Sequence, residues 1–194
     1  ETPALIESSL EAFDVALSQI TDKDAYWMAT QQDPRYVNDK KLRLLFLRAT
    51  EFDAEQAAKK FVAFFQGKLE LFGPQTLTRN LLFSDLTPVD YSYLKSGAFQ
   101  YLPVRDASGR SVFLDSHLII EQDPKWQPEN KIRTIVFLHL AALEDPETQR
   151  RGVVAIAYFI GKITAHTGTN MSQKLNALTE WLPMKNHAVH ICFD

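Results

Sequence analysis

Residues 46–61, FLRATEFDAEQAAKKF, indicate a pair of helices in the N-terminal part of the chain. The stretch predicts the end of one helix near Ala49, a break of three residues, and a second helix that begins after Asp53. Asp53 is a favourable N-cap and Gln56 follows it by three positions, which is the spacing of a capping box. We therefore expect two consecutive helices here, joined by a tight turn.

The flanking sequence extends this helical pattern over residues 1–75. Thr2 followed by Pro3 is typical of an N-cap and a first helical position, and apolar residues then repeat at steps of three and four. Asn38 can cap the helix that ends near Ala49. Gly and Pro at positions 73 and 74 end the second helix of the pair. The sequence thus predicts an all-helical lobe over residues 1–75.

Residues 76–194 have a different pattern, in which strands alternate with helices. A strand, a helix and a second strand joined by a connection of this length form a parallel crossover. The central strand is a continuous apolar run, which is typical of a strand covered on both faces. We predict an α/β fold in which the helical lobe packs on a mixed, partly parallel sheet flanked by helices. The expected elements are two extended runs within 99–114, a helix over 132–143, a strand over 152–161, a helix from 170 to 182 and a strand over 188–193.

Composition excludes several classes of function. The chain of 194 residues has a formal charge of −3, whereas nucleic-acid-binding domains are usually strongly basic, so we expect no nucleic acid partner. Cys192 is the only cysteine and cannot form an internal disulfide, which favours a reducing compartment and predicts a cytoplasmic protein. The longest apolar run is shorter than the roughly 20 residues of a membrane-spanning helix.

The sequence contains no recognisable catalytic or metal-binding motif. His187 and His190 are three positions apart on a strand, so their rings point to opposite faces and we expect no metal site. His190 and Cys192 share a face and form the skeleton of a thiol nucleophile. A buried strand cysteine is more often a small apolar residue, and nothing supplies an oxyanion hole. We expect no enzyme, with a thiol-dependent hydrolase as a minor alternative.

One face of the central strand carries unusually small side chains. It carries Val153, Ala155 and Ala157, whereas the other face carries larger residues. Small side chains allow either a helix to pack closely or an apolar ligand to occupy the space. Spacing alone leaves both interpretations open.

Four stretches together resemble the CRAL-TRIO family of lipid-binding proteins. The stretch LRLLFLRATEFDAEQAAKKF at 42–61 is similar to the helical entry module of that family, and LPVRDASGRSVFL at 102–114 resembles its Gly-Arg hairpin. The stretch ETQRRGVVAIAYFIG at 147–161 resembles the central strand, and LPMKNHAVHICFD at 182–194 the strand that a proline precedes. The residues at matching places in the first stretch are Phe46, Leu47, Arg48, Ala49, Phe52, Asp53 and Ala57. The resemblance runs in order from about residue 38 to the end.

The resemblance implies non-catalytic binding and transfer, or sensing, of a hydrophobic lipid in an apolar cavity. It further implies a cytoplasmic monomer that has no cofactor and associates transiently with membranes. His139 is the one polar group expected to face the cavity, where it would bond a ligand hydroxyl or a backbone carbonyl. By similarity to the tocopherol-transfer branch, the expected lining is Ile132, Ile135, His139, Val153, Ala155, Ala157, Ala177 and Leu178.

The same resemblance assigns Lys185 and His187 to phosphoinositide head groups at the membrane, although a solvated loop end would carry the same residues. Met184 stands where phosphatidylinositol-exchanging members tend to have an acidic residue, and Tyr158 replaces an Asp. The family's gate helix and last strand have no counterpart here, so we expect a fragment. The alternative function is a regulatory or interaction module whose cavity is filled by its own side chains and which docks to membranes or partners.

Overall fold

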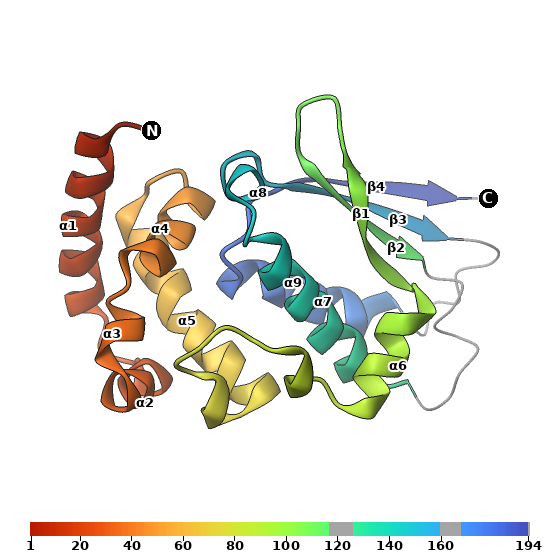
Figure 1. Ribbon diagram of the computed structural model, residues 1–194, viewed down its shortest axis with the longest axis horizontal. Helices are drawn as coiled ribbons and strands as arrows, with labels where there is room; N and C mark the ends of the chain where they lie inside the picture. The colour runs from red at the N-terminus through yellow and green to blue at the C-terminus, as the bar shows by residue number, and fades with distance from the viewer. Residues whose placement is uncertain (117–125, 160–167, 194) are drawn as a thin grey trace. The chain divides into compact units, whose positions relative to one another are not determined.

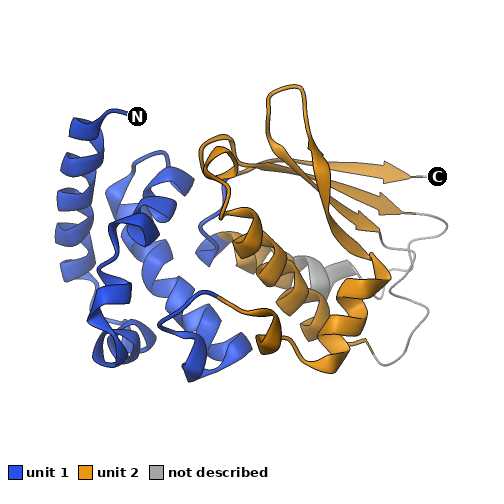
Figure 2. Ribbon diagram, in the orientation of Figure 1, with its two compact units in different colours: residues 1–80, 180–185 blue, residues 81–179, 186–194 orange. Residues whose placement is uncertain are grey.

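The computed structural model describes residues 1–116, 126–159 and 168–193, with side chains from 173 onward in the last segment. The chain divides into two compact units (Figure 2). Unit 1 comprises Glu1–Asn80 together with Glu180–Lys185, and unit 2 comprises Leu81–Thr179 together with Asn186–Asp194. The boundary near residue 80 is close to the expected one at 75, but no sequence pattern indicated that residues 180–185 belong to the helical unit.

Unit 1 is helical, as predicted. The helix expected to start at Pro3 is confirmed, and the hydroxyl of Thr2 accepts a hydrogen bond of 3.2 Å from the N–H of Leu5. The predicted cap at Asn38 is wrong, because the neighbouring Asp39 caps α4 and accepts from the N–H of Lys41 at 2.9 Å. The elements are α1 (Pro3–Gln19), α2 (Asp24–Gln32), α3 (Pro34–Val37), α4 (Lys40–Ala49), α5 (Ala54–Phe72) and the 3₁₀ turn η1 (Pro74–Thr76).

The break between α4 and α5 is a Schellman motif. The N–H of Phe52 donates to the carbonyl of Leu47 at 2.7 Å, and the N–H of Glu51 donates to that of Arg48 at 3.3 Å. Glu51 and Phe52 both have positive φ, at 55° and 67°. Glu51 occupies the position that usually holds glycine, so this turn costs more than its glycine equivalent.

Asp53 caps α5 as expected, but the reciprocal half of the capping box is wrong. The Asp53 carboxylate accepts from the Gln56 N–H at 3.0 Å. The Gln56 side chain then bonds the same carboxylate at 2.8 Å, and the N–H of Asp53 donates instead to the carbonyl of Thr50 at 3.0 Å. The Thr50 carbonyl therefore already satisfies the Asp53 N–H that the glutamine side chain would have reached.

Aromatic rings fill the core of unit 1. Phe61 lies at its centre and contacts Phe13, Phe46, Tyr26 and Phe65, with ring centroids 5.0–6.0 Å apart. Most of these pairs meet edge to face, the arrangement that the ring quadrupoles favour. Phe61, Phe13, Phe46 and Phe65 have no exposed surface. The core is therefore filled by the unit's own side chains.

Unit 2 is an α/β unit, and the predicted fold class is confirmed. The four strands within the described residues have the order β1-β2-β3-β4, in which β1 and β2 are antiparallel while β2, β3 and β4 are parallel (Figure 1). The predicted hairpin and the parallel crossover are both confirmed. The elements are η2 (Phe83–Asp85), α6 (Pro88–Ser96), β1 (Phe99–Arg105), β2 (Ser111–Ser116), α7 (Pro128–Ala142), α8 (Pro146–Arg151), β3 (Val153–Phe159), α9 (Gly168–Trp181) and β4 (Asn186–Phe193).

The helices α6, α7 and α9 lie on one side of this sheet (Figure 1). We call that side the helix-side face and the other the outer face. β3 is an inner strand, but Ile156 and Tyr158 on its outer face are only half-buried. The expectation that helices cover both faces of this strand is therefore wrong for the described residues.

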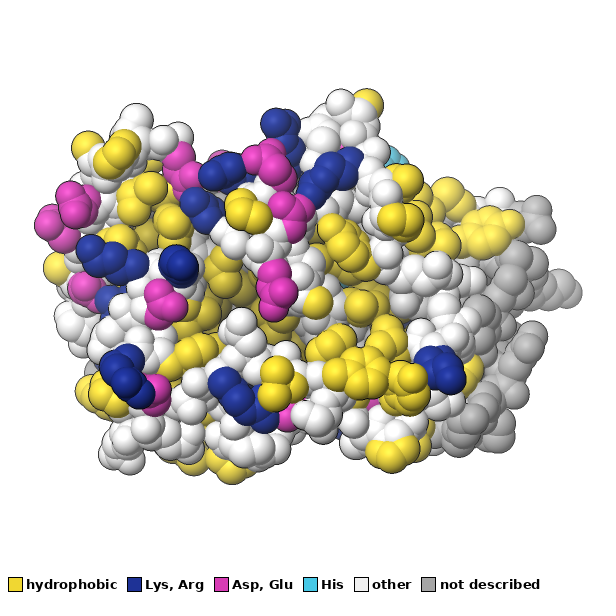
Figure 3. All heavy atoms as spheres, in the orientation of Figure 1, with side chains coloured by type: hydrophobic (Ala, Val, Ile, Leu, Met, Phe, Trp, Pro, Cys, Tyr) yellow, Lys and Arg dark blue, Asp and Glu magenta, His cyan; other side chains and the backbone are white. Residues whose placement is uncertain are grey.

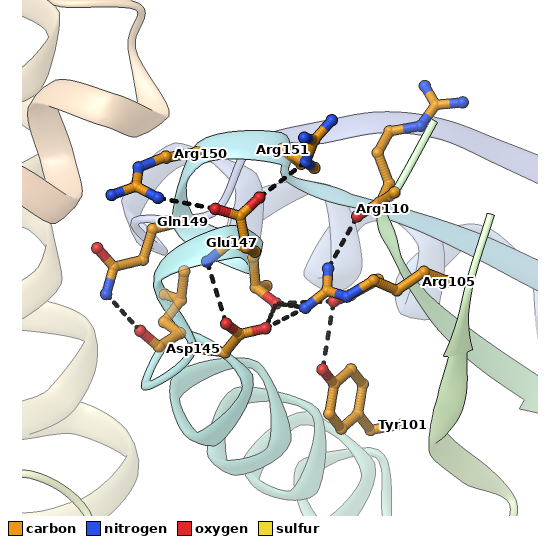
Figure 4. A network of polar contacts seen from close by, with 12 residues as sticks. Tyr101, Arg105, Arg110, Asp145, Glu147, Gln149, Arg150 and Arg151 are labelled. Atoms are coloured by element: carbon orange, nitrogen blue, oxygen red, sulfur yellow. Dashed lines mark hydrogen bonds and ion pairs between the residues drawn. The ribbon is translucent and has the colours of Figure 1, made fainter. Parts of the chain in front are cut away.

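A polar network holds the β1–β2 hairpin to α8 (Figure 4). Arg105 donates to the carboxylate of Asp145 and to the hydroxyl of Thr148, which is 2.7 Å from that of Ser111. The hydroxyl of Tyr101 lies 3.2 Å from the same Ser111 oxygen. The basic side chains here already have acidic or carbonyl partners, so the network fixes the hairpin relative to the start of β3.

Candidate functional site

The helix-side face of the sheet in unit 2 contains the strand residues that were predicted to line a cavity. Side-by-side pairing aligns Phe113 of β2 with Ala155 of β3 and Val189 of β4. The next row aligns Asp115, Ala157 and Ile191. Paired residues of neighbouring strands point to the same face. The small side chains of Ala155 and Ala157 are thus flanked by larger residues on both neighbouring strands.

The β4 part of this face is apolar and open to solvent. Val189, Ile191 and Phe193 are 63%, 57% and 64% exposed. Phe193 stacks on Phe159 of β3, with ring centroids 5.6 Å apart. Contiguous exposed apolar side chains commonly mark a surface that binds something. The sequence interpretation missed these three residues: their alternation along β4 places them on one face of the strand, but it does not show that this face is exposed.

The expected lining from α7 lies on the side of the helix that faces the sheet. Ile132 and Ile135 are 5% and 4% exposed, so the protein itself covers them almost completely. His139 is half-buried, and its ring stacks on Phe113 at 4.3 Å and on Phe99 at 5.7 Å. The imidazole is therefore nearly parallel to both phenyl rings.

Of the two hydrogen-bond partners expected for His139, a ligand hydroxyl or a backbone carbonyl, the structure shows the carbonyl. Its Nδ1 lies 2.8 Å from the carbonyl oxygen of Ile135, one turn earlier in α7. Burial lowers the pKa of His139 to about 4, against the smaller opposing effect of that hydrogen bond. The ring is therefore neutral near pH 7, with its proton on Nδ1. Its Nε2 forms no hydrogen bond with the described residues and can accept one from a ligand hydroxyl.

The remaining predicted lining residues differ in exposure. Val153 and Ala157 are buried, and Ala155 is half-buried. Leu178 of α9 is buried, whereas its neighbour Ala177 is exposed. The structure therefore brings the β3 and α7 residues together around the same face, and Ala177 is the predicted member that solvent reaches most.

Buried ion pairs fix α7 over the sheet. Lys131 donates to both carboxylate oxygens of Asp115 on β2, at 2.8 and 2.7 Å, and both residues are buried. Arg133 donates to both carboxylate oxygens of Asp90 on α6, at 2.7 and 2.9 Å. Burial alone would raise the pKa of Asp90, but the hydrogen bonds from Arg133, Asn130 and Thr87 outweigh it and lower the pKa. These contacts place His139 firmly, because they anchor its helix at two points.

The predicted head-group residues lie where unit 1 passes into unit 2. The ammonium of Lys185 is 2.5 Å from the carboxylate of Glu51, the residue at the centre of the Schellman turn. His187 is exposed and lies at an irregularity of β4, since Val153 pairs with Asn186 and Val154 pairs with Ala188. An anionic ligand at Lys185 would have to compete with Glu51.

The candidate thiol pair is on the outer face. The register pairs His190 with Ile156 and Cys192 with Tyr158, so both lie on the side away from α7. Both are exposed, and the expectation that Cys192 is buried is wrong. The part of the chain that the structure describes has no group of three or more His, Cys, Asp or Glu residues that could hold a metal ion.

Comparison with known proteins adds no assignment to this site. No family model matches the chain, and no curated protein matches it either. None of the helices within the described ranges is long and apolar enough to cross a membrane.

Proposed function

We propose that unit 2 binds a hydrophobic, lipid-like ligand on the helix-side face of its sheet and acts without catalysis as a lipid carrier or sensor. One observation carries the proposal: Val189, Ile191 and Phe193 are apolar and more than half exposed on the face where the helices pack. The order of motifs that resembles the CRAL-TRIO family supports the same function. Burying an acyl chain there would gain about 0.8 kcal/mol per methylene.

The neutral His139 limits the chemistry of the ligand. Its Nδ1–H is used by the Ile135 carbonyl, so its Nε2 can only accept a hydrogen bond. A ligand with a hydroxyl would satisfy Nε2, whereas a carboxylate has no proton to donate near neutral pH. We therefore favour a hydroxylated apolar molecule over a fatty acid.

A second function, the regulatory or interaction module, is favoured by a separate observation. Ile132, Ile135 and Val153, all predicted to line a cavity, are buried by the protein's own atoms. If the space between α7 and the sheet is already filled, the domain would dock to a partner rather than enclose a ligand.

Organic extraction and native mass spectrometry of the purified protein, combined with uptake of a fluorescent fatty alcohol, distinguish the two functions. The carrier function predicts co-purifying lipid and saturable uptake. Ile191→Ser should weaken uptake about tenfold, because the substitution removes apolar contact from the ligand face. Val104→Ser on β1 is the matched control, since Val104 is 56% exposed and Ile191 is 57% exposed.

Equal uptake by the Ile191→Ser and Val104→Ser variants would exclude β4 as the ligand face. Absence of both bound lipid and uptake in the wild-type protein would favour the interaction module.

A further inference from the structure

A second exposed apolar surface in unit 2 lies on η2 and α6. Leu82, Phe83 and Tyr91 are 54%, 50% and 41% exposed, and with the adjacent Phe137 and Lys95 they form what we call the η2–α6 patch. Figure 3 shows hydrophobic side chains gathered over this part of unit 2.

The patch is built from aromatic rings in mutual contact. The Phe83 ring meets Tyr91 at 4.9 Å and Phe137 of α7 at 6.0 Å, both edge to face. Phe137 is two positions from His139, which corresponds to about 200° around the helix. The patch and the candidate ligand face therefore use opposite sides of α7, and the patch is a separate surface.

Capping interactions hold the patch rigid. The carboxylate of Asp85 accepts from the N–H of Leu82 at 2.7 Å, which fixes the start of η2. Thr87 and Asp90 form a reciprocal capping box at the start of α6, with hydrogen bonds of 3.2 and 2.8 Å. Asp90 is in turn bound by Arg133 of α7. Side chains presented on a fixed backbone lose less entropy when they bind.

One cation stands at the edge of the patch. The ammonium of Lys95 lies 5.4 Å from the centre of the Tyr91 ring and forms no ion pair with the described residues. Apolar rings beside a tyrosine hydroxyl and a free lysine match the layers of a bilayer surface, where hydrocarbon lies beneath phosphates. Protein–protein interfaces, by contrast, are depleted in lysine relative to the rest of the surface.

From these observations we infer that the η2–α6 patch docks the protein on a phospholipid bilayer. Leu82 and Phe83 enter the boundary between head groups and acyl chains, and Lys95 meets the phosphates. The charges of Lys95 and Asp85 nearly cancel, so apolar insertion dominates and the surface requires no particular anionic head group. The inference does not depend on the proposed ligand at His139.

Co-sedimentation with phosphatidylcholine vesicles, with and without phosphatidylserine, tests the inference. The wild-type protein should bind both vesicles, and added salt should weaken its binding to the phosphatidylserine vesicles by no more than the contribution of one lysine, about fivefold. Leu82→Ser combined with Phe83→Ser should weaken binding to both by about tenfold or more. Lys95→Gln should weaken binding to the phosphatidylserine vesicles by about fivefold.

The control is Leu5→Ser combined with Val15→Ser on α1, because these residues are 41% and 59% exposed but lie in unit 1. The control should bind vesicles like the wild-type protein. Failure of the wild-type protein to sediment with vesicles would overturn the inference, as would unchanged binding by the patch variant. A patch variant that loses self-association in sedimentation velocity without any vesicle binding would show a protein contact instead.

Uptake of the fluorescent fatty alcohol in detergent-free solution separates this inference from the proposed function. The patch variant should take up the alcohol normally while failing to bind vesicles. If the wild-type protein binds vesicles but takes up no alcohol, the result counts against the proposed ligand face alone.

Discussion

The aromatic core of unit 1 and the helix-side face of the sheet in unit 2 are both apolar, but only the first is closed by the chain. Phe61 and its neighbours have no exposed surface, whereas Val189, Ile191 and Phe193 on β4 are more than half exposed. A closed apolar cluster contributes its full burial to stability. An open one contributes little until another molecule covers it, so the same residue types serve folding in one unit and binding in the other.

Truncating one residue in each region tests this difference most directly. Phe61→Ala should lower the free energy of unfolding by about 4 kcal/mol, because it opens a cavity among four rings. The melting temperature should fall by roughly 10 °C. Ile191→Ala should change the stability by less than about 0.5 kcal/mol, since the side chain is already exposed. Urea unfolding followed by circular dichroism measures both, and similar losses would show that the β4 face is closed in solution.

The pH dependence of stability tests whether His139, the polar group of the proposed ligand face, is buried. The pKa of His139 falls from 6.5 to about 4 on folding, so the unfolded chain binds the proton first. The stability that depends on a neutral His139 is fully present above pH 6.5 and is lost as the pH falls to about 4. The free energy of unfolding changes by about 3 kcal/mol over this range.

His139→Phe keeps a ring to stack on Phe113 and removes the titration. The difference between wild-type and variant unfolding free energies should therefore vary between pH 6.5 and 4 and be constant outside that range. A constant difference across the whole range would mean that the imidazole is solvated in the folded protein.

The smallest effect concerns the strained turn in the otherwise well-packed unit 1. Glu51→Gly should raise the free energy of unfolding by about 1 kcal/mol, because glycine adopts positive φ without steric cost. The variant also loses the ion pair with Lys185. Lys185→Gln is the matched control, since it removes the same pair and leaves the turn unchanged. Thermal unfolding of both variants isolates the backbone contribution, and equal melting temperatures would exclude strain at Glu51.

Local signals in the sequence predicted much of the fold. Thr2 and Pro3 begin α1, Asp53 caps α5, and the glycine turn joins β1 to β2, as expected. These signals act over a few residues, so they survive without tertiary information. The choice of Asp39 over Asn38 as the α4 cap was not predictable, because both residues can cap and the turn that ends α3 decides between them.

The candidate site was predictable only in part. The β3 stripe and α7 were expected to face each other, and the structure places them on one side of the sheet. The exposure of β4 could not be inferred from its apolar composition, which is equally typical of a buried strand. The carbonyl partner of His139 was one of two expected outcomes, and the structure identifies it.

Sequence patterns were enough to predict the main helices and strands, the helical character of the first 75 residues and the parallel crossover, because these follow from capping, periodicity and chain length. Which apolar residues the protein covers and which charges it pairs could be known only from the packing in three dimensions. Asp90 and Arg133 lie 43 positions apart, and Glu51 and Lys185 belong to distant segments. Such contacts depend on how elements pack in three dimensions, and no pattern confined to neighbouring residues records that packing.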